Sequence, residues 1–323
     1  MLLPDLTALQ QAAKQVYQHL SPSPQLSWPL LNERCDAEIW VKHENHNPTG
    51  AFKVRGGLVY MQRLRQAQPE LQAVVTATRG NHGQSVAFAA ARHGFDVTIV
   101  VPEGNNPDKN AAMRALGAEL VVHGADFDDA VAHAAELAER ENLHRMPSFH
   151  MDLVEGVASY ALELLQAQPD LERIYVPIGL GSGVCGTICA RNALGLNTEI
   201  VGVVSDGADC YYQSLVAGHC VPTESAATLA DGLAVRTPSP EALALMRANV
   251  DHIVRVSDDQ VLQAIDILFT DTHNVAEGAG AAALAAAMQE AGQNQGRKIA
   301  VVLSGGNIDK PLFCRALAGS QRQ

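Results

Sequence analysis

Residues 176 to 186 read VPIGLGSGVCG, which is the pattern of a buried strand, a glycine-rich turn and the first turn of a helix. Gly179, Gly181 and Gly183 allow the backbone to approach an anion closely, and the unpaired amides at a helix N-terminus attract a phosphate group. A tight turn between a strand and a helix does not by itself require three alternating glycines. The stretch therefore predicts a phosphate-binding loop at the carboxyl end of a strand.

Short β-branched runs alternate with alanine-rich helical runs on both sides of this loop. Strands are expected at 73–78, 96–102 and 118–124 before it, and at 199–205 and 298–303 after it. Strands that are apolar throughout and separated by helices predict parallel sheets covered on both faces. We expect an α/β protein with two open, mostly parallel sheets flanked by helices. The pattern also fits one sheet shared with the N-terminal stretch.

The composition limits the classes of protein that the chain can belong to. It has 323 residues, of which 47% are hydrophobic and 18% charged, so it is expected to be a soluble globular protein large enough for two domains. Its net charge of -12 disfavours a nucleic-acid or anionic-membrane partner. Neither a signal peptide nor a membrane span is indicated, so a cytoplasmic location is expected. The six cysteines include no C-x-x-C pair, which argues against a disulfide framework or a zinc site.

Three further motifs carry chemically useful groups. In NHNPTGAFKVR (45–55), Lys53 follows a turn-forming stretch and small or apolar neighbours, an unusual setting for a solvated lysine. TRGNHGQ (78–84) lies between a strand and a helix, where its amides can hold a carboxylate and Asn81 can donate to an oxygen. Its alternative is a helix cap with a polar first turn. SGGN (304–307) places Ser304 at a strand tip, although Gly-Gly turns are common there.

The glycine loop also has a second interpretation. Gly181 to Gly186 fits the dinucleotide fingerprint, and Asp206 follows about twenty residues later at the end of a strand. A dehydrogenase would use this aspartate to bind a ribose and would not require a reactive Lys53. An NAD-dependent oxidoreductase is therefore the alternative from another class of enzyme.

Taken together and in this order, NPTGAFKVRGG, TRGNHGQ, VPIGLGSG and SGGN resemble the fold type II pyridoxal-phosphate enzymes, and within them the threonine/serine dehydratase family with its serine racemase-like relatives. The resemblance runs from about residue 40 to residue 310. It implies a large cofactor-binding domain formed by residues 1–72 and 149–323, and a small domain formed by residues 73–148. It also implies pyridoxal 5'-phosphate as the cofactor and a homodimer or higher homo-oligomer.

The resemblance assigns roles to individual positions. Lys53 would bind the cofactor covalently, Phe52 would pack beside its ring, Asn81 would bond its 3-hydroxyl group, and Ser304 would face its pyridine nitrogen. The loop that would hold the phosphate comprises Gly179, Leu180, Gly181, Ser182 and Gly183. The loop that would bind the substrate's α-carboxylate comprises Thr78, Arg79, Gly80, Asn81 and His82.

The resemblance also implies a reaction. The family eliminates water from β-hydroxy-α-amino acids such as threonine, serine or 3-hydroxyaspartate, which gives a 2-oxo acid and ammonia. The amine of Lys53, once displaced by the substrate, would take the α-proton. A serine at the pyridine nitrogen cannot protonate it as an aspartate would, which favours elimination over transamination.

Three departures from the family pattern set this chain apart. Arg79 stands where serine racemases carry a serine that acts as an acid and base, and arginine is a poor proton shuttle, which disfavours the alternative of an amino-acid racemase. We hypothesise that Arg79 favours a substrate side chain with an acceptor or a negative charge. The alternative is that Arg79 turns to solvent or pairs with an acidic residue at the domain interface. Val204 and Cys210 replace the acidic pair that binds a divalent cation in several relatives, so no such metal is expected. Only sixteen residues follow Asn307, so no C-terminal regulatory domain is expected.

Overall fold

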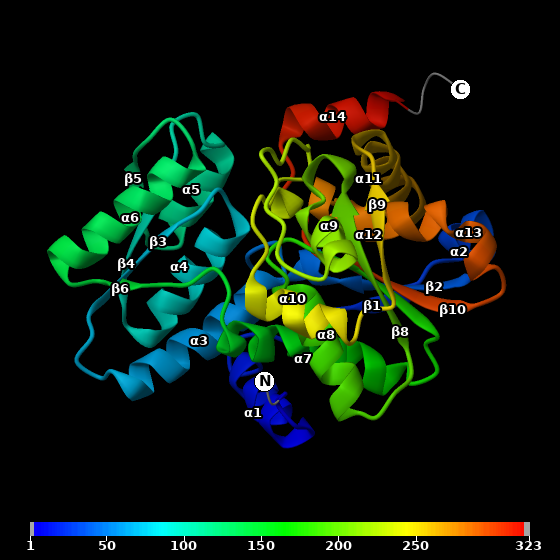
Figure 1. The fold of residues 1–323 in the computed structure, drawn as a ribbon, viewed down its shortest axis with the longest axis horizontal. Coiled ribbons are helices and arrows are strands. Elements are labelled where there is room, and N and C mark those ends of the chain that lie inside the picture. Colours follow the sequence, from blue (N-terminus) through cyan, green and yellow to red (C-terminus); the bar gives the residue numbers. More distant parts are fainter. Residues whose placement is uncertain (1–2, 320–323) are drawn as a thin grey trace.

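The computed structural model describes residues 3–319 and contains two groups of elements, each built around its own sheet (Figure 1). The larger group holds both chain ends, and the smaller group, drawn in cyan to green, lies beside it. Within residues 3–319, no helix is both long and apolar enough to cross a membrane.

The larger sheet has six strands in the order β1-β2-β10-β7-β8-β9. All neighbouring strands are parallel except β1, which is antiparallel to β2 at one edge. The strands are β1 (Gln25–Ser27), β2 (Glu38–His43), β7 (Arg173–Pro177), β8 (Glu199–Ser205), β9 (His252–Val256) and β10 (Lys298–Leu303).

Helices cover both faces of this sheet, because side chains that alternate along its strands are buried on either side. In β10, for example, Ile299 and Val301 belong to one apolar core and Ala300 and Val302 to the other. The first core is completed by α2 (Pro29–Cys35), α11 (Asp258–Thr272), α12 (Gly278–Gln289) and α14 (Lys310–Gly319). The second is completed by α1 (Leu6–Val16), α7 (Met151–Ala167), α8 (Ser182–Ala193), α9 (Cys210–Ala217) and α10 (Pro240–Arg247).

The smaller sheet has four parallel strands in the order β5-β4-β3-β6. They are β3 (Ala73–Ala77), β4 (Asp96–Val101), β5 (Glu119–Val122) and β6 (His144–Arg145). One face is covered by α3 (Lys53–Ala67), α4 (Asn81–His93) and α5 (Pro107–Ala115), and the other by α6 (Phe127–Glu141). Because α3 lies outside residues 73–148 and still packs against this sheet, the domain boundaries stay a prediction.

The expected fold class of two open, mostly parallel sheets flanked by helices is confirmed. Local sequence signals fix the helix ends: Gly94 ends α4 in the left-handed conformation, and the Asp126 side chain caps α6 by accepting from two backbone amides. The remaining elements are short: α13 (Ala291–Asn294) and the 3-10 turns η1 (Glu44–His46), η2 (Asp206–Ala208) and η3 (Asp231–Leu233).

Candidate active site

A cavity of about 630 Å³ lies between the two sheets, and both groups of elements contribute to its walls. The lining comprises Lys53, residues 77–82, Lys109, residues 126–128 and Ser148, together with Leu180, Thr223, Ala226, Asp231, Gly232, residues 234–237 and Glu277. The β3–α4 loop and the glycine loop both follow the carboxyl end of a strand, which is where open α/β sheets bind ligands.

Lys53 is the first residue of α3 rather than part of the preceding loop, and its backbone is held on two sides. The amide of Phe52 donates to the Ser304 carbonyl oxygen at 3.0 Å, and the Ser85 hydroxyl donates to the Lys53 carbonyl oxygen at 2.7 Å. The amine lies 5.0 Å from the centre of the Phe52 ring. Burial lowers the pKa of Lys53 to about 8, although the nearby carboxylate of Glu277 opposes this shift. A substantial fraction of the amine is therefore neutral near physiological pH.

The glycine loop, residues 179–183, begins α8, and two tyrosine hydroxyl groups support it. Tyr211 donates to the Leu180 carbonyl oxygen and Tyr160 to the Gly183 carbonyl oxygen, each at 2.9 Å. Gly181 has a φ of +102°, and a Cβ there would lie 2.7 Å from the Met246 methyl group. The turn therefore requires glycine at this position, both for its backbone conformation and for its close packing.

The glycine loop also approaches the Lys53 segment. A Cβ built on Gly183 would lie 3.6 Å from the Phe52 ring, and Leu180 lines the cavity together with Lys53. The amides at the N-terminus of α8 thus lie near the amine, as a site for a phosphorylated ligand requires.

The segment Thr78–His82 lies at the N-terminus of α4 and lines the cavity along its whole length. The Thr78 hydroxyl accepts from the amides of Gly80 and Gly83, which fixes the shape of the turn. Arg79 is exposed, and within residues 3–319 its side chain has no hydrogen-bonding or ionic partner. Its guanidinium group is therefore available to a ligand at the cavity wall.

His82 is held in its neutral form. Burial, followed by the positive charge of Lys53, lowers its pKa to about 3. Its Nε2 atom is buried without a hydrogen-bond partner among the described residues. A buried ring nitrogen of this kind is a group that a ligand in the cavity can satisfy.

Glu277 is the principal site residue that the motifs did not identify. Its Oε1 atom accepts from the Asn81 side-chain amide at 2.6 Å, and the Asn307 side chain donates to the Oδ1 atom of Asn81 at 2.8 Å. Burial raises the pKa of Glu277 to about 7, against the opposing effects of Lys109 and of the Asn81 hydrogen bond.

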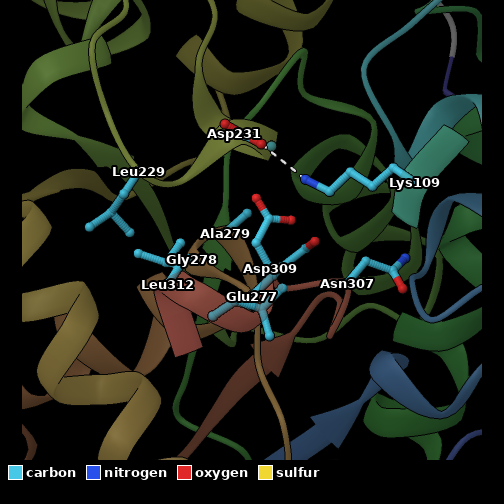
Figure 2. Close-up of a pocket in the computed structure, with 11 residues that line it drawn as sticks. Lys109, Leu229, Asp231, Glu277, Gly278, Ala279, Asn307, Asp309 and Leu312 are labelled. Carbon is cyan, nitrogen blue, oxygen red and sulfur yellow. Dashed lines mark hydrogen bonds and ion pairs between the residues drawn. The ribbon is translucent and has the colours of Figure 1, made fainter. Parts of the chain in front are cut away.

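A second, water-sized cavity of about 20 Å³ lies against Glu277 (Figure 2). Lys109 of α5 reaches across it to Asp231 at 2.9 Å, beside Asn307 and Asp309. This ion pair joins the two groups of elements next to the larger cavity. Local sequence signals do not reveal it, because the two residues are 122 positions apart.

The structure brings most of the predicted positions together. Lys53, Leu180 and the whole of Thr78–His82 line the larger cavity. Phe52, Ser304 and the four other glycine-loop residues are not part of its lining, but Phe52 contacts the glycine loop and pairs with the Ser304 backbone.

The residues around Val204 and Cys210, considered above for a divalent cation, make other contacts. Val204 is buried, and the Cys210 thiol donates to the Val235 carbonyl oxygen. Asp209 pairs with Arg255, whereas Asp206 is exposed. Among residues 3–319, no group of three or more His, Cys, Asp or Glu side chains is placed to hold a metal ion.

Comparisons with known proteins agree on one family. Residues 16–305 match the family described as pyridoxal-phosphate dependent enzyme. The chain is 35% identical over 297 residues to the biosynthetic L-threonine dehydratase IlvA of Salmonella typhimurium, covering 91% of this chain and 58% of that protein. It is 36% identical over 305 residues to the L-threonine ammonia-lyase of Geobacter sulfurreducens, covering 94% of this chain and 75% of that protein.

A solved structure has a comparable sequence identity to this chain. The processed form of threonine deaminase isoform 2 from Solanum lycopersicum superimposes with a TM-score of 0.90 at 31% identity, covering 98% of this chain and 95% of that one. The first curated relatives are longer, since the chain spans about 58% of their length. The match over residues 16–305 decides against the dinucleotide-binding alternative at Gly181 to Gly186. The chain belongs to the family of pyridoxal-phosphate dependent enzymes.

Proposed function

We propose that the chain is an ammonia-lyase that eliminates water from a β-hydroxy-α-amino acid and yields a 2-oxo acid and ammonia. The observation that carries the proposal is the amine of Lys53, whose pKa is lowered to about 8 by burial and which faces the Thr78–His82 segment across one cavity. The names of the relatives, L-threonine dehydratase and L-threonine ammonia-lyase, support the same reaction.

The residues around the cavity fit pyridoxal phosphate. The glycine loop would hold its phosphate at the N-terminus of α8, where Gly181 keeps the backbone free of a side chain. Lys53 would attach it covalently, Phe52 would lie beside its ring, Asn81 would bond its hydroxyl group and Ser304 would face its ring nitrogen. When bound, this cofactor supplies an electron sink for the negative charge left by removal of the α-proton.

The chain's own residues would remove the α-proton and orient the substrate. The amine of Lys53 would take the α-proton, since a pKa near 8 leaves it partly neutral at pH 7 to 8. Thr78, Gly80, Asn81 and His82 would orient the substrate through its α-carboxylate, using the free amides at the start of α4. The proposal involves no divalent cation.

The decisive experiment combines product analysis with a covalent label. Purified protein incubated with pyridoxal phosphate should release 2-oxo acid and ammonia from at least one hydroxylated amino acid. Borohydride reduction should fix the cofactor on Lys53, as identified by peptide mass spectrometry. Lys53→Ala should lose at least about 10³-fold in turnover because it removes the base and the attachment point, while still admitting cofactor. A protein that binds NAD and leaves Lys53 unlabelled would overturn the proposal.

Arg79 is the proposed determinant of the substrate's side chain. Its guanidinium group is exposed at the cavity wall without a partner among the described residues, so it can bind a carboxylate or another acceptor on the substrate. Arg79→Ala should lower kcat/KM for threo-3-hydroxyaspartate about 10- to 100-fold and change it little for threonine. Equal ratios of the two kcat/KM values in wild type and variant would refute this role.

The proposed assembly is a homodimer or higher homo-oligomer acting in the cytoplasm. The oligomer rests on the family resemblance, and the location is the expectation given under the sequence analysis. Analytical ultracentrifugation of the purified protein and fractionation of cells that express it provide the tests.

A further inference from the structure

Two residues after Lys53, the side chain of Arg55 is fully buried between two carboxylates. Its Nε and Nη2 atoms donate to the two oxygens of Glu44 at 2.7 and 3.0 Å, which is a bidentate pair. Its Nη1 and Nη2 atoms donate to the two oxygens of Glu163 at 2.6 and 3.1 Å. Nη1 also donates to the Ser159 hydroxyl at 2.9 Å. These five hydrogen bonds match the five N–H groups of the guanidinium group.

Both carboxylates have further buried partners. Lys42 donates from its amine to Glu163 at 2.5 Å, and its side chain is 0% exposed. Glu44 accepts from the Ser23 hydroxyl at 2.5 Å and from the Asn47 side-chain amide at 2.8 Å. Two positive and two negative side chains therefore form a closed, neutral network, which we call the Arg55 network and which consists of Lys42, Glu44, Arg55 and Glu163.

Stability alone does not account for such a network. Removing four charges from water carries a large desolvation cost, and well-packed apolar side chains in place of a buried ion pair are often as stable or more stable. What a closed set of directed, charge-assisted hydrogen bonds provides is a fixed geometry for the backbone segments that carry it. The role of the network therefore follows from which backbone segments it joins.

The network brackets the segment that carries the reactive lysine. Glu44 and Asn47 precede this segment and Arg55 follows it, while Ser159 and Glu163 belong to the neighbouring helix α7. Elsewhere the segment is held by uncharged hydrogen bonds. Phe52 donates to Ser304, Gly306 donates to the Gly50 carbonyl oxygen, and the side chains of Asn307 and Ser85 donate to the carbonyl oxygens of Thr49 and Lys53. The Arg55 network thus supplies the ionic anchor of residues 47–55.

We infer that the Arg55 network positions Lys53, with Arg55 as the positioning residue that fixes the direction of the amine relative to the glycine loop. The inference rests on the proposed function, because it concerns the lysine that would bind the cofactor. Loss of the network should let residues 47–55 shift, and a displacement of about 1 Å is enough to cost on the order of 10²-fold in rate.

The test compares Arg55→Met with Arg55→Lys and with a matched control, Arg173→Met. Arg173 is also a buried arginine, which donates to Glu199 at 2.7 Å and to Asn294 at 2.9 Å. It opens β7, at the end of the sheet opposite to the glycine loop. Both methionine variants lose one buried ionic anchor, and only one of the anchors adjoins Lys53.

Four quantities are compared for each protein: the Kd for pyridoxal phosphate, the fraction of bound cofactor that borohydride fixes on Lys53, amide hydrogen exchange of residues 44–56, and kcat. KM is determined in the same kinetic experiment as kcat. Arg55→Met should lower the fixed fraction and kcat at least about tenfold, and accelerate exchange in residues 44–56, with a smaller change in KM. Arg55→Lys should recover part of each loss because it keeps the charge without the bidentate geometry. Arg173→Met should alter none of the four quantities by more than about twofold.

The inference is wrong if Arg55→Met retains the wild-type fixed fraction and exchange rates, or if Arg173→Met shows the same losses. Should Arg55→Met fail to fold, Ser159→Ala removes one hydrogen bond and no charge, and it should give the same pattern at smaller size. Unchanged exchange and labelling in that variant would also overturn the inference. Absence of Lys53 labelling in wild type would refute the proposed function instead, which keeps the two failures distinct.

Discussion

At the scale of single residues, the carboxyl group of Glu277 has the most informative environment. It is buried, donates nothing when ionised, and accepts from Asn81 beside the amine of Lys53. Its pKa is raised from 4.5 to about 7, so the folded protein binds more protons at this site than the unfolded chain does between these pH values. The contribution of Glu277 to stability therefore falls as pH rises from about 4.5 to about 7, and it is constant above that.

Glu277→Gln should remove this pH dependence. The glutamine carbonyl oxygen can still accept from Asn81, so the variant should gain on the order of 2 kcal/mol in free energy of unfolding relative to wild type between about pH 5 and pH 7.5. Urea unfolding of the cofactor-free protein at both pH values measures the difference. Glu136→Gln, which changes an exposed carboxylate, should show no such trend. A parallel pH dependence in wild type and Glu277→Gln would contradict the assignment.

At the scale of elements, the turn between β7 and α8 depends on glycine for two separable reasons. Gly181 has a positive φ, and it also lies too close to Met246 and Ala242 for a Cβ. Gly195, just beyond the end of α8, has a φ of +65° but no atom within 4 Å of a Cβ built on it. An alanine at Gly195 would therefore test backbone strain alone, whereas an alanine at Gly181 would test strain and steric crowding together.

Gly195→Ala should cost about 1 kcal/mol of stability through its left-handed backbone alone. Gly181→Ala should cost about 3 kcal/mol, because overpacking adds to the same strain, and it should also weaken pyridoxal phosphate binding at least about tenfold. Thermal unfolding and a cofactor titration by fluorescence measure both effects. If the two variants behaved alike, the close packing at Gly181 would have no energetic importance.

At the scale of the whole molecule, the two groups of elements meet across the cavity through polar pairs. Lys109 pairs with Asp231, Asn106 with Asp309, and Asp128 with Arg236. Ion pairs with an exposed partner contribute little to stability. Their positions at the cavity suggest a role in holding the two groups at the distance that the substrate requires.

Lys109→Met should therefore raise KM and lower kcat/KM about tenfold, while the free energy of unfolding changes by less than about 1 kcal/mol. Lys298→Met is the matched control, because Lys298 pairs with Asp170 at 2.7 Å at the start of β10. Steady-state kinetics and urea unfolding of both variants provide the measurement. An equal fall in kcat/KM for Lys298→Met would show that the effect is not specific to the cavity.

The alternation of apolar strands with alanine-rich helices was enough to predict the fold class. The spacing of apolar residues, and the residues that end a helix, can both be recognised within a short stretch of sequence. The strands β1, β2, β6 and β9 escaped prediction. They are short or carry polar residues, and they are stabilised by pairing with neighbours distant in sequence.

The amino-acid sequence by itself determined most of the elements and the ordered motifs that contain Lys53, the Thr78–His82 segment and the glycine loop. Only the tertiary structure decided which other groups line the cavity or anchor the lysine segment. Glu277, Lys109 and the Arg55 network come from positions up to about 220 residues away from Lys53. The physical reason is that a pKa or an ion pair depends on burial and on distances of a few ångströms. These are set by how the two groups of elements fold and meet across the cavity, and no local pattern encodes them.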